Sequence, residues 1–336
     1  MLMKNNTIAT DICVYPDSGV TIDKKRRDFL PDEIEMRKKA GKNTSEASDD
    51  MQDIRNSEVA EWHGKKLLNL TWSIYQGDAV KVLKKIPDES VNCVVTSPPY
   101  FWLRDYGVEE QIGMEETVSD YVEAINAVMD EVQRVLRKDG LLFLNIGDTY
   151  YSGKGQSQGK DKKSNKRRFG LRVVDKSGGM DIDIQRKSVI GIPWRVAIEM
   201  TSRKWVLRSP IIWHRENCLP EHVKDRPSRS YEYVFMFAKD RRYFFDKKPL
   251  IDKKVEEDMW TITARPKNGG IDTAPFPDEL VQRCLEIGCE SGGVVLDPFL
   301  GSGTTVRVAL AMGYSAIGIE LNREFCLYSV DQLEAL

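Results

Sequence analysis

Short apolar segments alternate with amphipathic segments over most of the chain, and this alternation constrains the fold more than any other feature. Four apolar segments are rich in Val, Ile and Leu and show no helical period, as expected of strands buried on both faces. They are residues 91–95, 141–148, 293–298 and 315–320. Helices are predicted between them, so the sequence predicts an α/β protein with a doubly wound, mostly parallel sheet.

The longest predicted helix covers residues 117–136, where apolar side chains recur every three or four positions, and Lys138-Asp139-Gly140 is expected to stop it. The remaining elements are predicted from propensity and from turn residues. They are helices at 79–85, 193–200, 276–288, 306–312 and from Arg323, and strands ending at Gly77-Asp78 and covering 208–213 and 231–238.

Composition excludes several classes of protein. The 336 residues contain no apolar run of membrane-spanning length, and the N-terminus lacks the apolar core of a signal peptide. The six cysteines show no C-x-x-C spacing, so we expect reduced thiols in a cytoplasmic protein, without a metal site. The net charge is only −2, but residues 151–187 hold 11 Lys/Arg against 4 Asp/Glu, a local net of +7. Any nucleic-acid contact must come from such local clustering.

The strand at 91–95 ends in an unusual way. Thr96 and Ser97 are followed by two prolines, which can neither continue a sheet nor together start a helix, and then by three aromatic residues. The segment therefore predicts a rigid turn, poor in hydrogen-bond donors, at the carboxyl end of a buried strand.

A second turn, in VVLDPFLGSGTT at 294–305, joins a strand to a helix through Gly301 and Gly303. Such glycines let the backbone approach a ligand that faces the N–H groups of the helix N-terminus, although a plain strand–helix turn can also contain them. Glu320 follows 17 residues after Gly303, where a carboxylate can accept from both ribose hydroxyls of a nucleoside. Val306 replaces the third glycine of a dinucleotide site. Asp297 would repel a pyrophosphate but suits an ammonium and a sulfonium, as in S-adenosylmethionine.

Together, TSPPY and, about 200 residues later, DPFLGSGTT resemble the β group of S-adenosylmethionine-dependent amino DNA methyltransferases, which methylate N4 of cytosine or N6 of adenine. The resemblance extends to GDA at 77–79, NIGD at 145–148 and FPDEL at 276–280, and it covers roughly residues 66–330. It implies a Rossmann-like class I methyltransferase fold in circularly permuted order, with an inserted target-recognition region. Double-stranded DNA is the implied substrate, with the target base flipped out of the duplex.

The catalytic residues implied by the resemblance are Ser97, Pro98, Pro99, Tyr100 and Asp148. An exocyclic amine is a poor nucleophile because its lone pair is delocalised into the ring. The Ser97 hydroxyl and the Pro98 carbonyl can accept from its two N–H bonds, the prolines aim that carbonyl, and Tyr100 offers a flat face to the base. Asp148 either orients Ser97 or accepts backbone N–H groups at the following turn. Phe101 and Trp102 are expected to pack around the corner rather than contact a base. No Pro-Cys dipeptide occurs, which disfavours carbon-5 chemistry through a thiolate.

The cofactor site implied by the resemblance draws on both halves of the chain. It consists of Asp78, Thr96, Phe276, Pro277, Asp297, Pro298, Phe299, Gly301, Ser302, Gly303, Thr304 and Glu320. Thr273 departs from the family pattern, which often has His at this position.

Phosphate contacts are assigned to the basic run in the insertion, although a charge run is often only a solvated surface. The run comprises Lys160, Lys162, Lys163, Lys166, Arg167 and Arg168. Arg226, Arg229 and Arg241 are further candidates for this contact.

The organisation expected from these assignments has six segments. They are a polar, partly helical or disordered extension (1–62), a catalytic half (63–150), a basic target-recognition insertion (151–187), strands completing the sheet (188–246), an irregular connection (247–275) and a cofactor-binding half (276–336).

The target atom follows from Ser97, because Ser in this place usually accompanies N4 of cytosine in the family, whereas Asp or Asn usually accompanies N6 of adenine. The alternatives are an N6-adenine enzyme, an RNA or protein-amine methyltransferase, and a catalytically silent DNA-binding module. A cognate restriction endonuclease as a functional partner, and a homodimer, are compatible with the resemblance.

Overall fold

The computed structural model describes residues 60–65, 70–103, 106–108, 110–151, 183–218, 223–264 and 275–336. The expected extension up to residue 59 and the basic run at 160–168 therefore lie outside the described residues, as does Thr273.

The described strands form one nine-stranded sheet, ordered β1-β2-β9-β8-β3-β4-β6-β5-β7. The strands are β1 (Glu61–Lys65), β2 (Thr71–Gln76), β3 (Val91–Thr96), β4 (Leu136–Ile146), β5 (Val206–His214), β6 (Tyr231–Ala238), β7 (Met259–Thr261), β8 (Val294–Asp297) and β9 (Ser315–Glu320). The five central strands β2, β9, β8, β3 and β4 are mutually parallel. The pairs β1–β2, β4–β6 and β6–β5 are antiparallel, and β7 pairs parallel with β5. The prediction of a mostly parallel sheet is confirmed.

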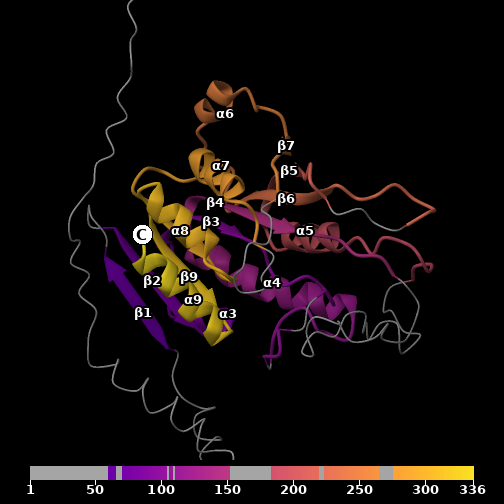
Figure 1. Ribbon diagram of the computed structural model, residues 1–336, viewed down its shortest axis with the longest axis horizontal. Coiled ribbons are helices and arrows are strands. Elements are labelled where there is room, and N and C mark those ends of the chain that lie inside the picture. Colours follow the sequence, from indigo (N-terminus) through magenta and orange to yellow (C-terminus); the bar gives the residue numbers. More distant parts are fainter. Residues whose placement is uncertain are drawn as a thin grey trace, which may run out of the picture.

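Helices cover both faces of this sheet (Figure 1). The helices are α3 (Ala79–Leu83), α4 (Val118–Val135), α5 (Ile192–Ser202), α6 (Lys248–Lys253), α7 (Asp278–Gly288), α8 (Thr304–Ala311) and α9 (Arg323–Glu334). Helices α3, α4 and α5 pack on the face that carries Val94, while α6, α7, α8 and α9 pack on the face that carries Cys93 and Val95. Alternate residues of β3 thus point into two separate cores, which is the doubly wound arrangement.

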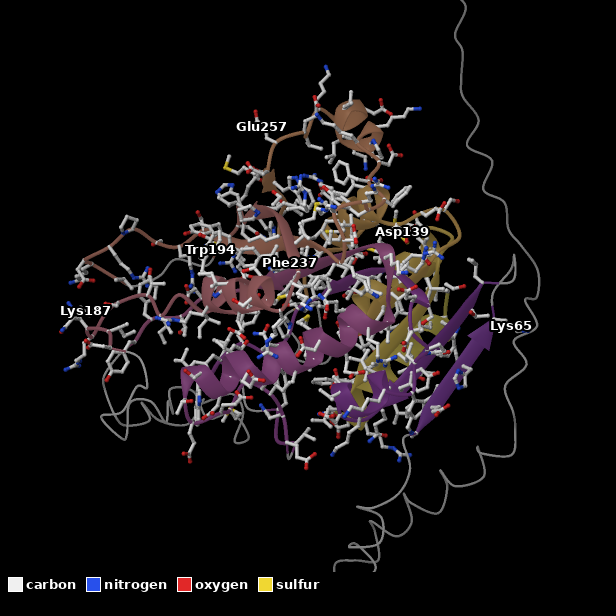
Figure 2. All side chains as sticks on the ribbon, turned by 180° about the vertical axis from the view of Figure 1, so that it is seen from behind. Lys65, Asp139, Lys187, Trp194, Phe237 and Glu257 are labelled. Carbon is white, nitrogen blue, oxygen red and sulfur yellow. The ribbon has the colours of Figure 1, made fainter. Side chains whose placement is uncertain are left out.

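The face covered by α5 is rich in aromatic contacts. The Trp194 ring of α5 packs edge-on against Tyr233 and Phe235 of β6, with ring centroids 5.6 and 5.2 Å apart. Figure 2 labels Trp194, on α5, and Phe237, on β6, in the view from behind. These contacts fix the strands that follow the insertion against the central parallel sheet.

Several predicted boundaries were wrong. Helix α4 ends at Val135, one residue before its predicted end, but the predicted stop at Lys138-Asp139-Gly140 lies inside β4, because Leu136 is already extended and pairs with Val91 of β3. Strand β4 ends at Ile146, before Asp148. Strand β1, which begins at Glu61, falls across the predicted boundary at residue 62; it alternates between exposed and half-buried residues and pairs only with β2. The connection at 247–275, predicted to be irregular, contains α6 and β7.

In the described part of the chain, no helix is long and apolar enough to cross a membrane. The described cysteines are free thiols, and four of the five are buried.

Candidate active site

The order of the strands brings the two sequence motifs together. Strands β3 and β8 are parallel neighbours, with Cys93 opposite Val295 and Val94 opposite Leu296. The corner after β3 and the Gly-rich turn after β8 therefore leave the same edge of the sheet. The Thr96 hydroxyl donates to Oδ1 of Asp297 at 2.6 Å, across 201 residues of sequence. The Thr305 hydroxyl donates to Oδ2 of Asp297 at 2.7 Å and lies 3.1 Å from the Val95 carbonyl.

A cavity of about 820 Å³ opens at this edge, and both motifs line it. Thirteen of the predicted catalytic and cofactor residues lie on its wall: Asp78, Ser97, Pro98, Pro99, Tyr100, Phe276, Asp297, Pro298, Phe299, Gly301, Ser302, Thr304 and Glu320. The volume falls within the range of small-molecule sites in proteins.

The Ser-Pro-Pro-Tyr corner is held by α4 and by the segment that leads into it. The Tyr121 hydroxyl donates to the Pro99 carbonyl at 2.9 Å, and the Trp102 N–H donates to the Gly113 carbonyl at 2.7 Å. Phe101 is only 3% exposed, and its ring packs against Tyr121 with centroids 5.2 Å apart. These contacts support the expectation that Phe101 and Trp102 pack around the corner. The backbone of the corner is thus fixed before a base arrives.

The Tyr100 ring lies against the backbone of Gly147, where an added Cβ would come within 2.5 Å of a ring carbon. Its hydroxyl donates to Oε2 of Glu232 on β6 at 2.6 Å. Burial, reinforced by the Glu232 carboxylate, raises the pKa of Tyr100 well above its usual range, and a hydrogen bond with the Ser97 side chain offsets this only in part. Tyr100 therefore stays protonated, with its hydroxyl tied to the cavity wall.

Polar residues from β4, from β6 and from the position after β5 complete the wall and were missed in the sequence. They are Asn145, Arg215 and Glu232, with Trp213 beside them. The Arg215 guanidinium donates from Nη1 to Oε1 of Glu232 at 2.9 Å. One signal was present: Glu232 is the single charged residue in the strand YEYVFMFA, and a carboxylate there requires a partner.

Asp297 occupies a buried position between the two motifs. Its carboxylate accepts from Thr96, Thr305 and the Phe299 N–H, and its side chain is almost inaccessible to solvent. Burial raises its pKa to about 6, because these three neutral donors offset the desolvation of the charge only in part. A ligand ammonium group would supply the missing positive charge, so the site fits S-adenosylmethionine.

The next strand provides the second carboxylate of the cofactor half. Oε2 of Glu320 accepts from the Gly301 N–H and Oε1 from the Asn322 N–H, each at 2.8 Å. Burial raises the pKa of Glu320, while these backbone donors lower it. Glu320 lines the cavity, and each of its oxygens can accept a further hydrogen bond, as a ribose diol requires. Asp78 lies close by, because the Gly77 N–H donates to the Glu320 carbonyl at 2.9 Å.

Four predicted site residues do not line the cavity. Thr96 is fully buried and holds Asp297, and Pro277 is the buried N-cap of α7. Gly303 begins α8 with φ +82°, and an added Cβ would come within 2.9 Å of the Ser329 hydroxyl. Gly303 thus provides a tight turn rather than a ligand contact.

The fourth of these residues, Asp148, was assigned two alternative roles, and the structure shows the second. Its Oδ1 accepts from the Thr149, Gly191 and Ile192 N–H groups at 2.8, 3.1 and 3.1 Å. These amides include the start of α5, where a helix N-terminus attracts negative charge. Asp148 therefore anchors α5, and its catalytic assignment stays a prediction.

Two of the three further arginine candidates, Arg226 and Arg229, lie near Tyr150, just before the insertion. The guanidinium carbon of Arg226 lies 3.9 Å from the centroid of the Tyr150 ring, and Arg229 donates to the Asp148 carbonyl. The six residues of the basic run themselves are outside the described part of the chain.

Three features of the parallel sheet together define an S-adenosylmethionine-dependent methyltransferase. They are a Gly-rich turn after one central strand, a carboxylate at the end of the next strand, and a Ser-Pro-Pro-Tyr corner beside them. The chain belongs to the DNA methylase family (N6_N4_Mtase), whose model matches residues 91–331. It is therefore an S-adenosylmethionine-dependent DNA methyltransferase.

Individual proteins resemble the chain over most of its length. It is 41% identical over 268 residues to the type II methyltransferase M.XycI of Xanthomonas campestris pv. cyanopsidis, covering 78% of this chain and 87% of that protein. The structure of PvuII DNA methyltransferase (cytosine-N4-specific) aligns with a TM-score of 0.61 at 22% identity, covering 78% of this chain and 86% of that one. A putative DNA modification methylase of Thermus thermophilus, complexed with S-adenosyl-L-methionine, aligns with a TM-score of 0.54 at 25% identity, covering 78% and 94%.

Proposed function

We propose that this chain is a type II methyltransferase that transfers a methyl group to the exocyclic N4 of a cytosine flipped out of duplex DNA. The observation that carries the proposal is the position of Ser97 on the wall of the cavity shared with Gly301 and Glu320. Within the family, Ser in this place usually accompanies cytosine as the target.

The corner is suited to activate an amine. The Ser97 hydroxyl and the Pro98 carbonyl accept from the two N–H bonds of the base and draw its nitrogen toward tetrahedral geometry. The Tyr100 ring, fixed by Gly147 and Glu232, supports the face of the flipped base. S-adenosylmethionine, when bound, supplies the methyl group on its sulfonium. Asp297 and Glu320 hold its ammonium and ribose ends.

The decisive experiment is incubation of the purified protein with a plasmid library and labelled S-adenosylmethionine, followed by nucleoside analysis and sequencing. We expect N4-methylcytosine at one short sequence. N6-methyladenine in its place would overturn the assignment of the target atom, and no methylated nucleoside at all would favour a silent DNA-binding module.

We infer that the basic run contacts DNA phosphates. Neutralising Lys162, Lys163, Arg167 and Arg168 together should weaken binding to all duplexes. It should also reduce the slope of log K against log salt by as much as about 3.6, because each lost phosphate contact removes about 0.9 from it. Fluorescence anisotropy at several salt concentrations measures both effects. Neutralising Lys247, Lys248, Lys253 and Lys254 around α6 is the matched control. An unchanged slope in the first variant would assign the run to a solvated surface.

The buried Asp297 makes stability depend on pH in a defined direction. Its pKa is about 6 in the folded chain and about 3.9 unfolded, so the native state binds the proton more tightly. Protonation of Asp297 therefore stabilises the folded state. This stabilisation is fully present below the pKa of the unfolded chain and is lost as pH rises through 6. Between pH 5 and pH 8, apoprotein stability should fall by about 1 kcal/mol more than in Asp297→Asn. Urea denaturation of both proteins measures this difference, and parallel pH curves would show that Asp297 is ionised throughout.

The type II relatives also lead us to infer a cognate restriction endonuclease as a functional partner. Host DNA carrying the gene should then resist cleavage by that nuclease. The expectation of a homodimer is checked by light scattering of the purified protein.

A further inference from the structure

Arg215, one of the residues that line the cavity, has an unusual guanidinium. It directly follows β5 and lines the same wall as Ser97 and Tyr100. Nη1 of Arg215 donates to Glu232, whereas its Nε is buried and has no hydrogen-bond partner among the described residues. The two other buried side-chain atoms without a partner there belong to Asn126 and Trp205, which are not cavity residues. A buried donor without an acceptor is costly, so this Nε suggests that a ligand supplies one.

The position of this guanidinium is fixed by Glu232, whose side chain is only 13% exposed. Oε1 of Glu232 accepts from Arg215, while Oε2 accepts from the Tyr100 hydroxyl at 2.6 Å and from Asn145 at 3.3 Å. Arg215 is thus two hydrogen bonds away from the aromatic ring expected to support the flipped base. The cation and the aromatic face belong to one network of four residues.

The free part of the guanidinium has a definite shape. With Nη1 committed to Glu232, the opposite edge presents Nε and Nη2, two parallel donors in a fixed fork. Cytosine carries two adjacent acceptors, N3 and O2, on the edge that begins at its exocyclic amine. Adenine carries only N1 beside its amine, so one donor of the fork would stay unpaired.

We propose that Arg215 reads the target base by donating from this fork to N3 and O2 of the flipped cytosine, and that Glu232 is its positioning residue. The proposal rests on the proposed N4-cytosine activity and deepens it. It assigns selection of the base to the antiparallel strands β5 and β6, and activation of the amine to the corner after β3.

The test is a double-mutant cycle on the duplex whose target site the sequencing has located. Wild type and Arg215→Ala are each assayed for kcat/KM with cytosine and with 3-deazacytosine, which lacks the N3 acceptor, at the target position. The kcat/KM of wild type should be about 10- to 100-fold lower with the analogue than with cytosine, the range expected for one bidentate contact. In Arg215→Ala the loss should already be present with cytosine, so the penalty for the analogue in wild type should exceed the penalty in the variant by about 10-fold or more. The difference in intrinsic reactivity between the analogue and cytosine cancels when the two penalties are divided, because it is the same for both proteins.

Controls separate this role from support of the fold. Arg208→Ala removes an exposed arginine of β5, bonded to Tyr243, and should keep the full penalty for the analogue. Arg215→Lys keeps the charge without the fork and should lose most of that penalty. It replaces Arg215→Ala in the cycle if the alanine variant does not match the wild-type melting temperature and S-adenosylmethionine affinity.

Equal penalties for the analogue in wild type and variant would overturn the proposal and assign Arg215 to a DNA phosphate or to support of Glu232. This failure is distinct from failure of the proposed function. N4-methylcytosine in the nucleoside analysis together with equal penalties refutes only the role of Arg215, whereas N6-methyladenine refutes the target atom itself.

Discussion

Replacing Ser97 with alanine should lower kcat about 100- to 1000-fold while the Kd for S-adenosylmethionine changes less than about 2-fold. The magnitude is that expected when one preorganised hydrogen-bonding group is removed from a reacting centre. The hydroxyl lies on the cavity wall at the corner after β3, where an amine would be polarised. Cofactor affinity should be preserved because the link between the two motifs runs through Thr96, Asp297 and Thr305 instead.

Single-turnover methyl transfer and calorimetric titration of the cofactor measure the two quantities separately. Ser202→Ala, at the end of α5, removes a hydroxyl that bonds the Ile198 carbonyl of the same helix and should behave as wild type. If Ser97→Ala kept kcat within about 3-fold, Ser97 would have no part in the chemical step, and the Pro98 carbonyl would remain as the principal acceptor.

The meeting of Ser97 and Gly301 was predictable because both follow strands of a parallel sheet. In such a sheet the carboxyl ends of the strands share one edge, whatever their distance in sequence. The motifs therefore needed only a strand in front of each, and a continuous apolar run is sufficient to identify a buried strand.

Arg215 and Glu232 were not predictable in the same way. They come from antiparallel strands whose neighbours depend on pairing between distant segments, such as Leu144 opposite Phe235 and Ile211 opposite Val234. The alternation of apolar and polar residues within a strand does not specify which strand lies next to it. A shift of one residue in the pairing register would turn Glu232 to the other face of the sheet. Asp148 illustrates the same limit, since its partners at the start of α5 lie more than 40 residues along the chain.

Glu320→Ala should weaken S-adenosylmethionine binding by about 100-fold or more. Two hydrogen bonds from ribose hydroxyls to an ionised acceptor are lost, and bonds to charged groups contribute about 1.5–3 kcal/mol each. The Gly301 and Asn322 N–H groups also lose their acceptor, so the Gly-rich turn loses its support from β9. Glu320→Gln keeps the shape of the side chain but places an amide donor against one of these N–H groups. Its affinity for S-adenosylmethionine should lie between those of wild type and Glu320→Ala.

Thermal unfolding separates this loss of binding from misfolding. At a cofactor concentration of 100 times its Kd, wild type should gain about 2.7 kcal/mol. A variant with a Kd 100-fold weaker should gain only about 0.4 kcal/mol, because ligand stabilisation follows RT ln(1 + [L]/Kd). Without cofactor, Glu320→Gln should be less stable than wild type, because its amide leaves the Gly301 or the Asn322 N–H group without an acceptor, so the gain is measured from each variant's own baseline. Glu324→Gln, on the exposed first turn of α9, is the matched control and should keep the full gain. A Glu320 variant that kept the cofactor-induced gain but lost methyl transfer would move this carboxylate from cofactor binding to the chemical step.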